Sequence, residues 1–215
     1  MKNLSRVLFF CLLTIIATQT FAQKFGIQGG VNLSNMVYKD DEEDISDEFS
    51  MNLGFNAGVT FEMGFGEMFS LEAAVLAENK GFKWETDIFG PTVTTTANLL
   101  YIDVPVLFKA GLPLGPVKVF AAAGPYAGYG VTGKYKMESG DQSESEDVSW
   151  GSDAEEDDLK PFDYGAKFGV GAELKGLSLG VYYALGLANI SPYTDYGTKI
   201  SNKVLSISLG YKFGK

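Results

Sequence analysis

The sequence predicts an all-β fold, and more closely an eight-stranded antiparallel up-and-down transmembrane β-barrel. Three observations lead to this prediction. Apolar residues alternate with polar or small residues along most of the chain, eight such stretches follow one another, and the links between them are alternately short and long. Successive side chains of a strand point to opposite faces, so this alternation indicates strands with one apolar face.

The first 22 residues have the composition of a secretory signal peptide. Lys2 and Arg6 give a positively charged start, residues 7–17 are apolar except for one threonine, and Ala22 is a small residue before a cleavage point. The apolar run is shorter than the roughly 20 residues of a membrane-spanning helix. We therefore expect a cleaved signal peptide at residues 1–22 and one barrel domain at residues 23–215. The alternative is an N-terminal anchor that stays in place.

The charged and reactive residues exclude several classes of function. Loss of the signal removes Cys11, the only cysteine, and lowers the formal net charge from −10 to −12, because Lys2 and Arg6 leave with it. An acidic chain does not suit nucleic acid, whose phosphates require a basic surface. The chain contains no histidine, so Ser-His-Asp and Cys-His catalysis and most zinc sites are excluded. We therefore expect no enzyme activity and no cofactor.

Eight alternating stretches are long enough to cross a membrane as tilted strands, which requires about 9–11 residues each. Near the C-terminus, for example, Leu205, Ile207 and Leu209 alternate with Ser206 and Ser208. The predicted strands are residues 24–35, 52–64, 69–83, 98–111, 117–135, 162–174, 177–190 and 203–213.

The links between the predicted strands fall into two alternating classes. Three links are tight turns that contain glycine or proline, at residues 65–68, 112–116 and 175–176. Short turns at one end and long loops at the other are typical of outer-membrane barrels, and an even number of strands puts both termini on the short-turn, periplasmic side. The four long links are residues 36–51, 84–97, 136–161 and 191–202.

The direction of the two faces decides between a membrane barrel and a soluble, lipocalin-like periplasmic barrel that binds a ligand, which we keep as an alternative. One face carries bulky apolar side chains, and the other carries glycine and charged residues of both signs. An eight-stranded barrel is only just wide enough to be filled by side chains, so small residues suit its interior. A basic residue that faced lipid would cost about 2–4 kcal/mol at the middle of the membrane. We therefore expect the bulky face to point outward.

The charges of the small face are expected to pair inside the lumen. A lone buried charge would cost several kcal/mol, and pairing removes that cost, so we favour a structural network over a path for protons or ions. We further expect Asp103 and Lys109 to share one network. At Pro105 we favour a structural irregularity of the strand over a bulge that shapes the lumen. Lys80 and Asp163 lie at positions that point to the same face of their strands, but we do not include them in the predicted network. The predicted network is Glu62, Glu72, Glu78, Asp103, Lys109, Lys118, Lys167, Glu173 and Lys212.

Acidic residues are concentrated in two of the long links. Residues 40–48 and 138–158 hold 17 of the 27 aspartates and glutamates. Neither segment has the spacing of a dedicated calcium loop. We interpret both as solvated, mobile and mutually repulsive loops. Weak binding of calcium or magnesium is the alternative.

Several stretches of the chain resemble the PorT-like outer-membrane β-barrel family. They are LLYIDVPVLFK at residues 99–109, YALGLANI at 183–190, residues 202–213 with LGYKF at their end, and GGVNLS at 29–34. The chain departs from the pattern in one respect, since Gly214 and Lys215 follow the aromatic residue with which such barrels often end.

The resemblance implies insertion in the outer membrane of a Gram-negative bacterium, with lipid and the barrel assembly machinery as partners and another envelope protein as a further one. The expected role is a structural or interaction barrel, porin-like in fold, with acidic extracellular loops. An accessory barrel of a protein-secretion or gliding system is an alternative that the resemblance brings, and a passive pore is another. Eight strands usually leave no open aqueous channel, which argues against the pore.

Overall fold

The computed structural model describes residues 22–41, 49–87, 92–140 and 142–214. Residues 1–21 of the predicted signal peptide lie outside this part of the chain. Ten strands and one short 3-10 helix, η2 (Asp195–Gly197), are present in it, and none of its helices is long and apolar enough to cross a membrane. The strands are β1 (Ala22–Lys39), β2 (Phe49–Ser50), β3 (Asn52–Phe65), β4 (Phe69–Asp87), β5 (Thr92–Leu114), β6 (Val117–Ser139), β7 (Gln142–Asp147), β8 (Phe162–Leu174), β9 (Leu177–Gly186) and β10 (Lys199–Phe213).

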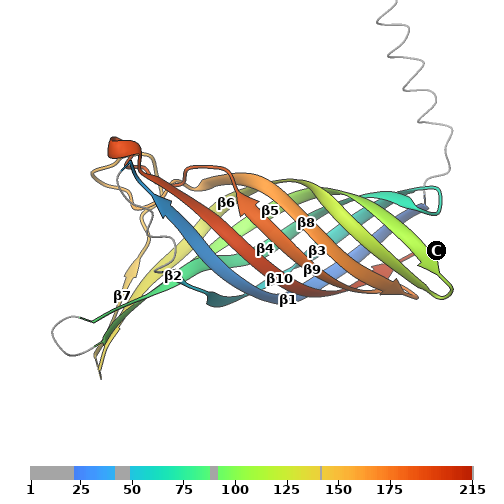
Figure 1. Cartoon of the computed structure of the whole chain (residues 1–215), viewed down its shortest axis with the longest axis horizontal. Helices are drawn as coiled ribbons and strands as arrows, with labels where there is room; N and C mark the ends of the chain where they lie inside the picture. The colour runs from blue at the N-terminus through green and yellow to red at the C-terminus, as the bar shows by residue number, and fades with distance from the viewer. Residues whose placement is uncertain (1–21, 42–48, 88–91, 141, 215) are drawn as a thin grey trace, which may run out of the picture.

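The ten strands form one antiparallel sheet that closes on itself (Figure 1). Each long strand pairs with the long strands before and after it in the chain, and β1 pairs with β10. β2 and β7 pair with β4 and β6 respectively and lie within links that the sequence predicted to be loops. The architecture is therefore the predicted up-and-down antiparallel barrel, with ten strands where eight were expected.

The strand ends on the long-loop side differ from the prediction. β4, β5 and β6 continue well past the expected ends, so most of the predicted link at residues 84–97 is strand. β9 ends at Gly186, four residues early. Together with β2 and β7, these extensions form a sheet that reaches beyond the barrel mouth (Figure 1). We call residues 49–50, 82–87, 92–97, 134–139 and 142–147 the projecting sheet.

One irregularity changes which side chains face inward. The register between β5 and β6 shifts between Leu100 and Tyr101, whereas Pro105 pairs with Tyr126 without a shift. The pairing is therefore regular at Pro105, and the irregularity expected there lies at Leu100 and Tyr101 instead. On β6, Val131 and Thr132 are both exposed, so the inward positions change from even to odd beyond them.

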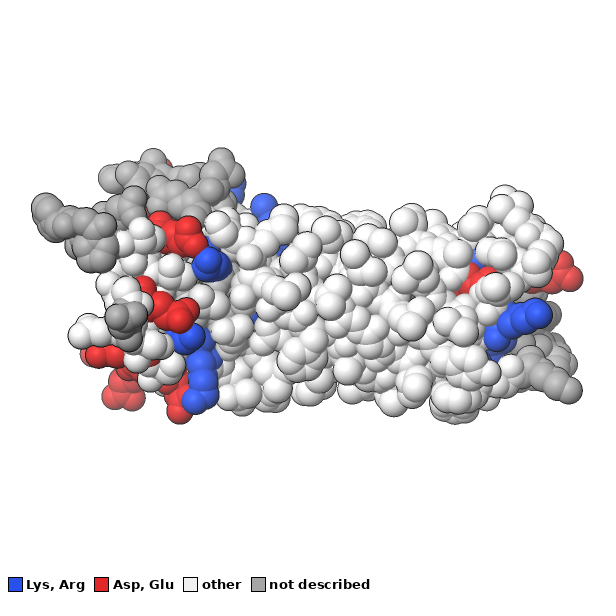
Figure 2. Space-filling view, turned by 90° about the horizontal axis from the view of Figure 1, so that it is seen from below, with Lys and Arg blue, Asp and Glu red and all other residues white. Residues whose placement is uncertain are grey.

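The two faces of the sheet point as the sequence predicted. Phe25, Leu53 and Val170 on the outer surface are 63%, 69% and 61% exposed, whereas Glu78 and Lys80 are fully buried inside. Figure 2 shows that the middle of the visible face of the barrel is a broad belt without charged residues, with acids and lysines gathered at the two ends of this face. The structure confirms that bulky apolar residues cover the outside and that charges occupy the interior.

Candidate functional site

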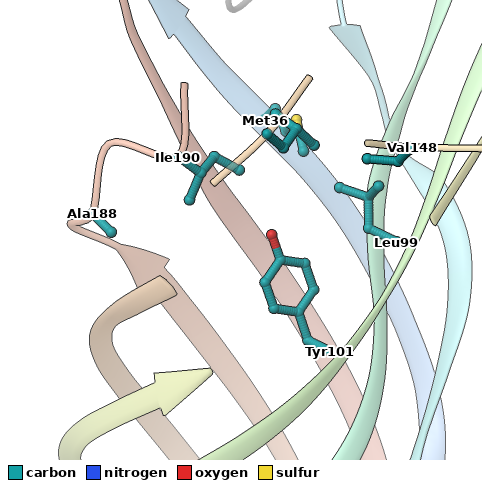
Figure 3. Packing of buried hydrophobic residues seen from close by; sticks show 7 residues of the cluster. Met36, Leu99, Tyr101, Val148, Ala188 and Ile190 are labelled. Atoms are coloured by element: carbon teal, nitrogen blue, oxygen red, sulfur yellow. The ribbon is translucent and has the colours of Figure 1, made fainter. Parts of the chain in front are cut away.

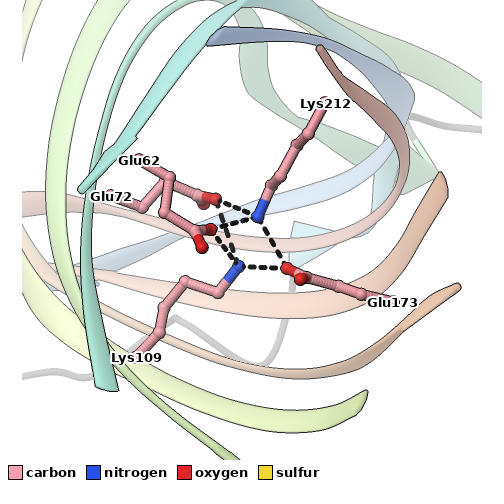
Figure 4. Close-up of polar contacts among 5 residues, drawn as sticks. All are labelled: Glu62, Glu72, Lys109, Glu173 and Lys212. Atoms are coloured by element: carbon pink, nitrogen blue, oxygen red, sulfur yellow. Dashed lines mark hydrogen bonds and ion pairs between the residues drawn. The ribbon is translucent and has the colours of Figure 1, made fainter. Parts of the chain in front are cut away.

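A cluster of five charged side chains fills the barrel interior near the short turns (Figure 4). Lys109 Nζ lies 3.2 Å from Glu62 Oε2, 3.1 Å from Glu72 Oε2 and 2.7 Å from Glu173 Oε1. Lys212 Nζ lies 2.9 Å from Glu72 and 2.6 Å from Glu173, and it also contacts Glu62. Five different strands supply these residues, so the short-turn cluster joins opposite walls of the barrel.

A second cluster lies further toward the long loops. Lys80 Nζ is 2.8 Å from Asp103 and 3.0 Å from Asp163, and all three side chains are almost completely buried. Lys167 Nζ donates to Glu78 Oε1 at 2.5 Å. Glu78 and Lys80 lie on the inward face of β4, and Asp163 and Lys167 lie on the inward face of β8. The Lys80–Asp163 and Lys167–Glu78 pairs therefore span the lumen. We call these four residues and Asp103 the loop-side cluster. Buried ion pairs of this kind hold their geometry because separating the partners would leave a bare charge away from water.

Neutral side chains complete the loop-side cluster. Tyr126 donates its hydroxyl to Asp163 Oδ2 at 3.1 Å, and Asn202 donates its amide to the same oxygen at 2.9 Å. The Lys80 ammonium lies 4.5 Å and 4.8 Å from the centres of the Tyr101 and Tyr126 rings. A cation close to aromatic faces is stabilised by the ring quadrupole. Hydrogen-bonding and aromatic side chains therefore surround the buried charges of the loop-side cluster on several sides.

The structure divides the predicted lumen residues between the two clusters. Asp103 and Lys109 do not share a network as we expected, because Leu107 lies between them on the inward face of β5 and each pairs within its own cluster. Lys118 is half-buried and forms no ion pair with any described residue. Lys80 and Asp163, which have the same inward parity, are the additional partners. The alternation of residue types could not show which inward lysines and acids pair, because the pairing depends on which strands face each other across the barrel.

An apolar cluster packs inside the barrel at the long-loop end, and we call it the outer plug (Figure 3). The segment after β7 folds inward, and Trp150 packs edge-on against Tyr101, with ring centres 5.5 Å apart. A Cβ atom at Gly130 would overlap the Trp150 ring, so glycine makes room for it. The buried members of the outer plug are Met36, Leu99, Tyr101, Val148, Leu159, Ala188 and Ile190, with Phe82, Tyr135, Trp150 and Ile200 packed against them.

Acids of the third long link hold the plug segment in shape. Asp158 accepts the Ser149 backbone N–H at 2.8 Å, and Asp157 accepts the Ser149 hydroxyl at 3.2 Å and the Asp153 N–H at 2.9 Å. These acids are exposed or half-buried, as expected of a solvated loop, but their hydrogen bonds show that the link is not only repulsive at these residues. Among the described residues, no group of three or more acidic, histidine or cysteine side chains could hold a metal ion. Residues 42–48 of the other acidic link lie outside the part that the structure describes.

Comparison with known protein families decides the class. The outer membrane protein β-barrel domain family matches residues 21–191. The chain belongs to this family. It is therefore an outer-membrane β-barrel protein, and the soluble periplasmic barrel kept as an alternative is wrong.

Several solved outer-membrane proteins are similar to this chain, at low sequence identity and low TM-score. Ail, the attachment invasion locus protein of Yersinia pestis, is 15% identical with a TM-score of 0.42, and the match covers 89% of this chain and 99% of that chain. The Neisserial surface protein A is 13% identical with a TM-score of 0.44, covering 88% and 97%. A major outer membrane protein from Thermus thermophilus is 14% identical with a TM-score of 0.41, covering 89% and 100%. No curated protein matches this chain.

Proposed function

We propose that the chain is a closed outer-membrane barrel whose eight long strands cross the membrane and whose role is structural or interactive at the cell surface, without catalysis or an open pore. The observation that carries this proposal is the filled lumen. From the short turns outward, the interior holds the short-turn cluster, the loop-side cluster and the outer plug.

The ion pairs support a structural rather than a conducting interior. Each lysine of the short-turn cluster lies within 4 Å of three carboxylates, so neither is available to a passing ion. An ion that passed through the lumen would have to break these ion pairs, which would cost several kcal/mol for each buried charge. A barrel of this width is filled by its own side chains, and the outer plug adds an apolar barrier.

The same contacts argue against an enzyme. A histidine-free hydrolase would need a pair of carboxylates with access to substrate. The buried carboxylates in Glu62, Glu72 and Glu78 are instead bound to lysines inside the barrel. The residues that remain exposed and charged lie at the two ends, which favours a role in contact with other molecules outside the membrane (Figure 2).

Recordings in planar lipid bilayers test this proposal. We expect no steady conductance from the purified barrel at moderate voltage. A matched variant that lacks residues 149–159 removes Trp150 and Leu159 from the plug but retains both charged clusters, and it should also stay closed if the clusters fill the lumen. A steady open conductance from the unaltered chain would contradict the proposal.

The narrower PorT-like assignment stays a prediction. It rests on the stretches at residues 29–34, 99–109, 183–190 and 202–213. In two of them, the inward side chains of Asp103, Lys109 and Ala184 line the lumen. These residues line the barrel interior and give no support for a partner in secretion or gliding. The accessory role in such a system is therefore a weaker proposal than the closed surface barrel.

A further inference from the structure

Within the part of the chain that the structure describes, β7 is an edge strand of the projecting sheet and has no neighbouring strand on one side. β7 pairs with β6, and among the described residues no other strand pairs with it. All six of its side chains are exposed. An unpaired edge presents backbone N–H and C=O groups that can accept another strand.

The register identifies which backbone groups are free. The Val148 N–H donates to Gly133 O at 2.9 Å, and these two residues lie directly opposite each other in the continued β6–β7 register. Hydrogen-bonded pairs alternate along an antiparallel ladder, so Glu146 and Glu144 also bond to β6. The N–H and C=O groups of Ser145, between them, therefore point away from β6.

A hollow beside this edge has the chemistry to receive a cationic side chain. It measures about 370 Å³ and is lined by Tyr135, Met137, Glu144, Ser145 and Glu146. Met137 and Tyr135 offer an apolar and aromatic floor, on which the stem of a long basic side chain can lie. The two glutamates supply carboxylates for its charged end, and an arginine can bind carboxylates through two hydrogen bonds.

The charge of the strand argues against a second copy of the chain as the occupant. Pairing two β7 strands would bring Glu144, Glu146 and Asp147 of both copies together, and like charges across a strand pair are destabilising. Glu155 and Glu156, in the link after β7, are exposed as well. Complementary charge favours a basic partner and accelerates its encounter.

We propose that β7 binds an extended basic segment of another protein, which adds to the sheet as a further strand and places an arginine or lysine in the hollow. This inference rests on the proposed display of the projecting sheet outside the membrane and specifies the partner class of that interaction role. Backbone pairing gives the affinity, and the two glutamates select for positive charge.

The test uses the whole barrel in lipid nanodiscs and a fluorescein-labelled octapeptide of alternating arginine and threonine. A second peptide of the same sequence carries N-methyl groups on alternate residues, so it keeps its charge but cannot donate along one edge. Fluorescence anisotropy should show saturable binding of the first peptide and at least about tenfold weaker binding of the second. Equal binding of the two peptides, or no binding of either, would overturn the proposal.

Variants of the barrel locate the contact. Ser145→Pro removes a free edge N–H while leaving the β6 ladder intact, and it should weaken binding about tenfold, whereas Ser145→Ala should change it less than about twofold. The double variant Glu144→Gln/Glu146→Gln should bind more weakly than the equally charged control Glu155→Gln/Glu156→Gln. Unchanged binding by Ser145→Pro, or equal losses in the two double variants, would contradict the site.

The closed-barrel proposal and the β7 binding site can be overturned independently of each other. Peptide binding by a barrel that also conducts ions steadily would overturn the closed-barrel proposal and leave the β7 site standing. A closed barrel that does not bind the basic peptide would overturn the β7 site alone.

Discussion

Lys80 and Asp163, which are 83 residues apart in the sequence, form a fully buried ion pair of 3.0 Å across the lumen. β4 and β8 are separated by two strands in the sheet, so this pair does not reinforce a neighbouring ladder. It ties together walls that backbone hydrogen bonds do not connect directly. The interior charges therefore act on the shape of the whole barrel.

Loss of the central lysine of the short-turn cluster should destabilise the barrel strongly. Lys109→Met leaves Glu62, Glu72 and Glu173 with Lys212 as their remaining cation, and we expect a loss of about 3–5 kcal/mol in the free energy of unfolding. Urea unfolding in phospholipid vesicles measures it. The control is Lys118→Met, which removes a half-buried lysine without an ion pair to any described residue and should cost less than about 1 kcal/mol. Similar losses in the two variants would mean that the ion pairs contribute nothing specific.

Removal of one carboxylate from the loop-side cluster should also lower the free energy of unfolding of the barrel. Asp103→Ala deprives Lys80 of the nearer of its two partners, at 2.8 Å, and leaves it with Asp163. We expect a loss of about 3 kcal/mol, because the lysine stays buried with less compensation.

The mobility of Asp103→Ala on gels, before and after heating in detergent, reports the temperature at which the barrel unfolds. That temperature should fall clearly below the value for the unaltered chain. Asp195→Ala, on the exposed helix η2, serves as the control and should leave it unchanged. An unaltered unfolding temperature for Asp103→Ala would refute its role in the cluster.

The outer plug should detach when the space for its tryptophan is filled. Gly130→Val places a side chain where the Trp150 ring lies, so the ring must move toward water. In a Trp84→Phe background, Trp150 is the single tryptophan, and its fluorescence emission should shift to longer wavelength. The control Ala127→Val changes an outward position of the same strand and should leave the emission in place. Emission that does not move in Gly130→Val would show that the plug is not packed as described.

The alternation of residue types was sufficient to predict the long strands and the direction of their faces. In β10, Leu205, Ile207 and Leu209 point outward or are half-buried while Ser206 and Ser208 are buried, as parity requires. Such a pattern reflects the free energy of transfer between lipid and the lumen, which acts on every residue of the strand.

Other features depend on partners that are remote in the sequence. β7 has the sequence QSESED, which lacks any apolar alternation, and it becomes a strand by pairing with β6. No residue type marks the register shift near Leu100, yet it decides that Tyr135 and Met137 line the hollow. The partners of Lys80 and Lys109 follow from which strands face each other after closure, which a local pattern does not contain.

Spin labels read by their collisions with oxygen and with a water-soluble nickel complex test the central claim most directly. Labels at Phe55, Val181 and Ile207, which are 51%, 41% and 47% exposed on the outer surface, should collide with oxygen and be protected from nickel, as expected in hydrocarbon. A label at Ser206, which is 1% exposed and faces inward, should be shielded from both. Nickel access at the three outer positions, with a hydrocarbon signature at Ser206, would contradict a barrel that turns its apolar face to lipid and its ion pairs to the lumen.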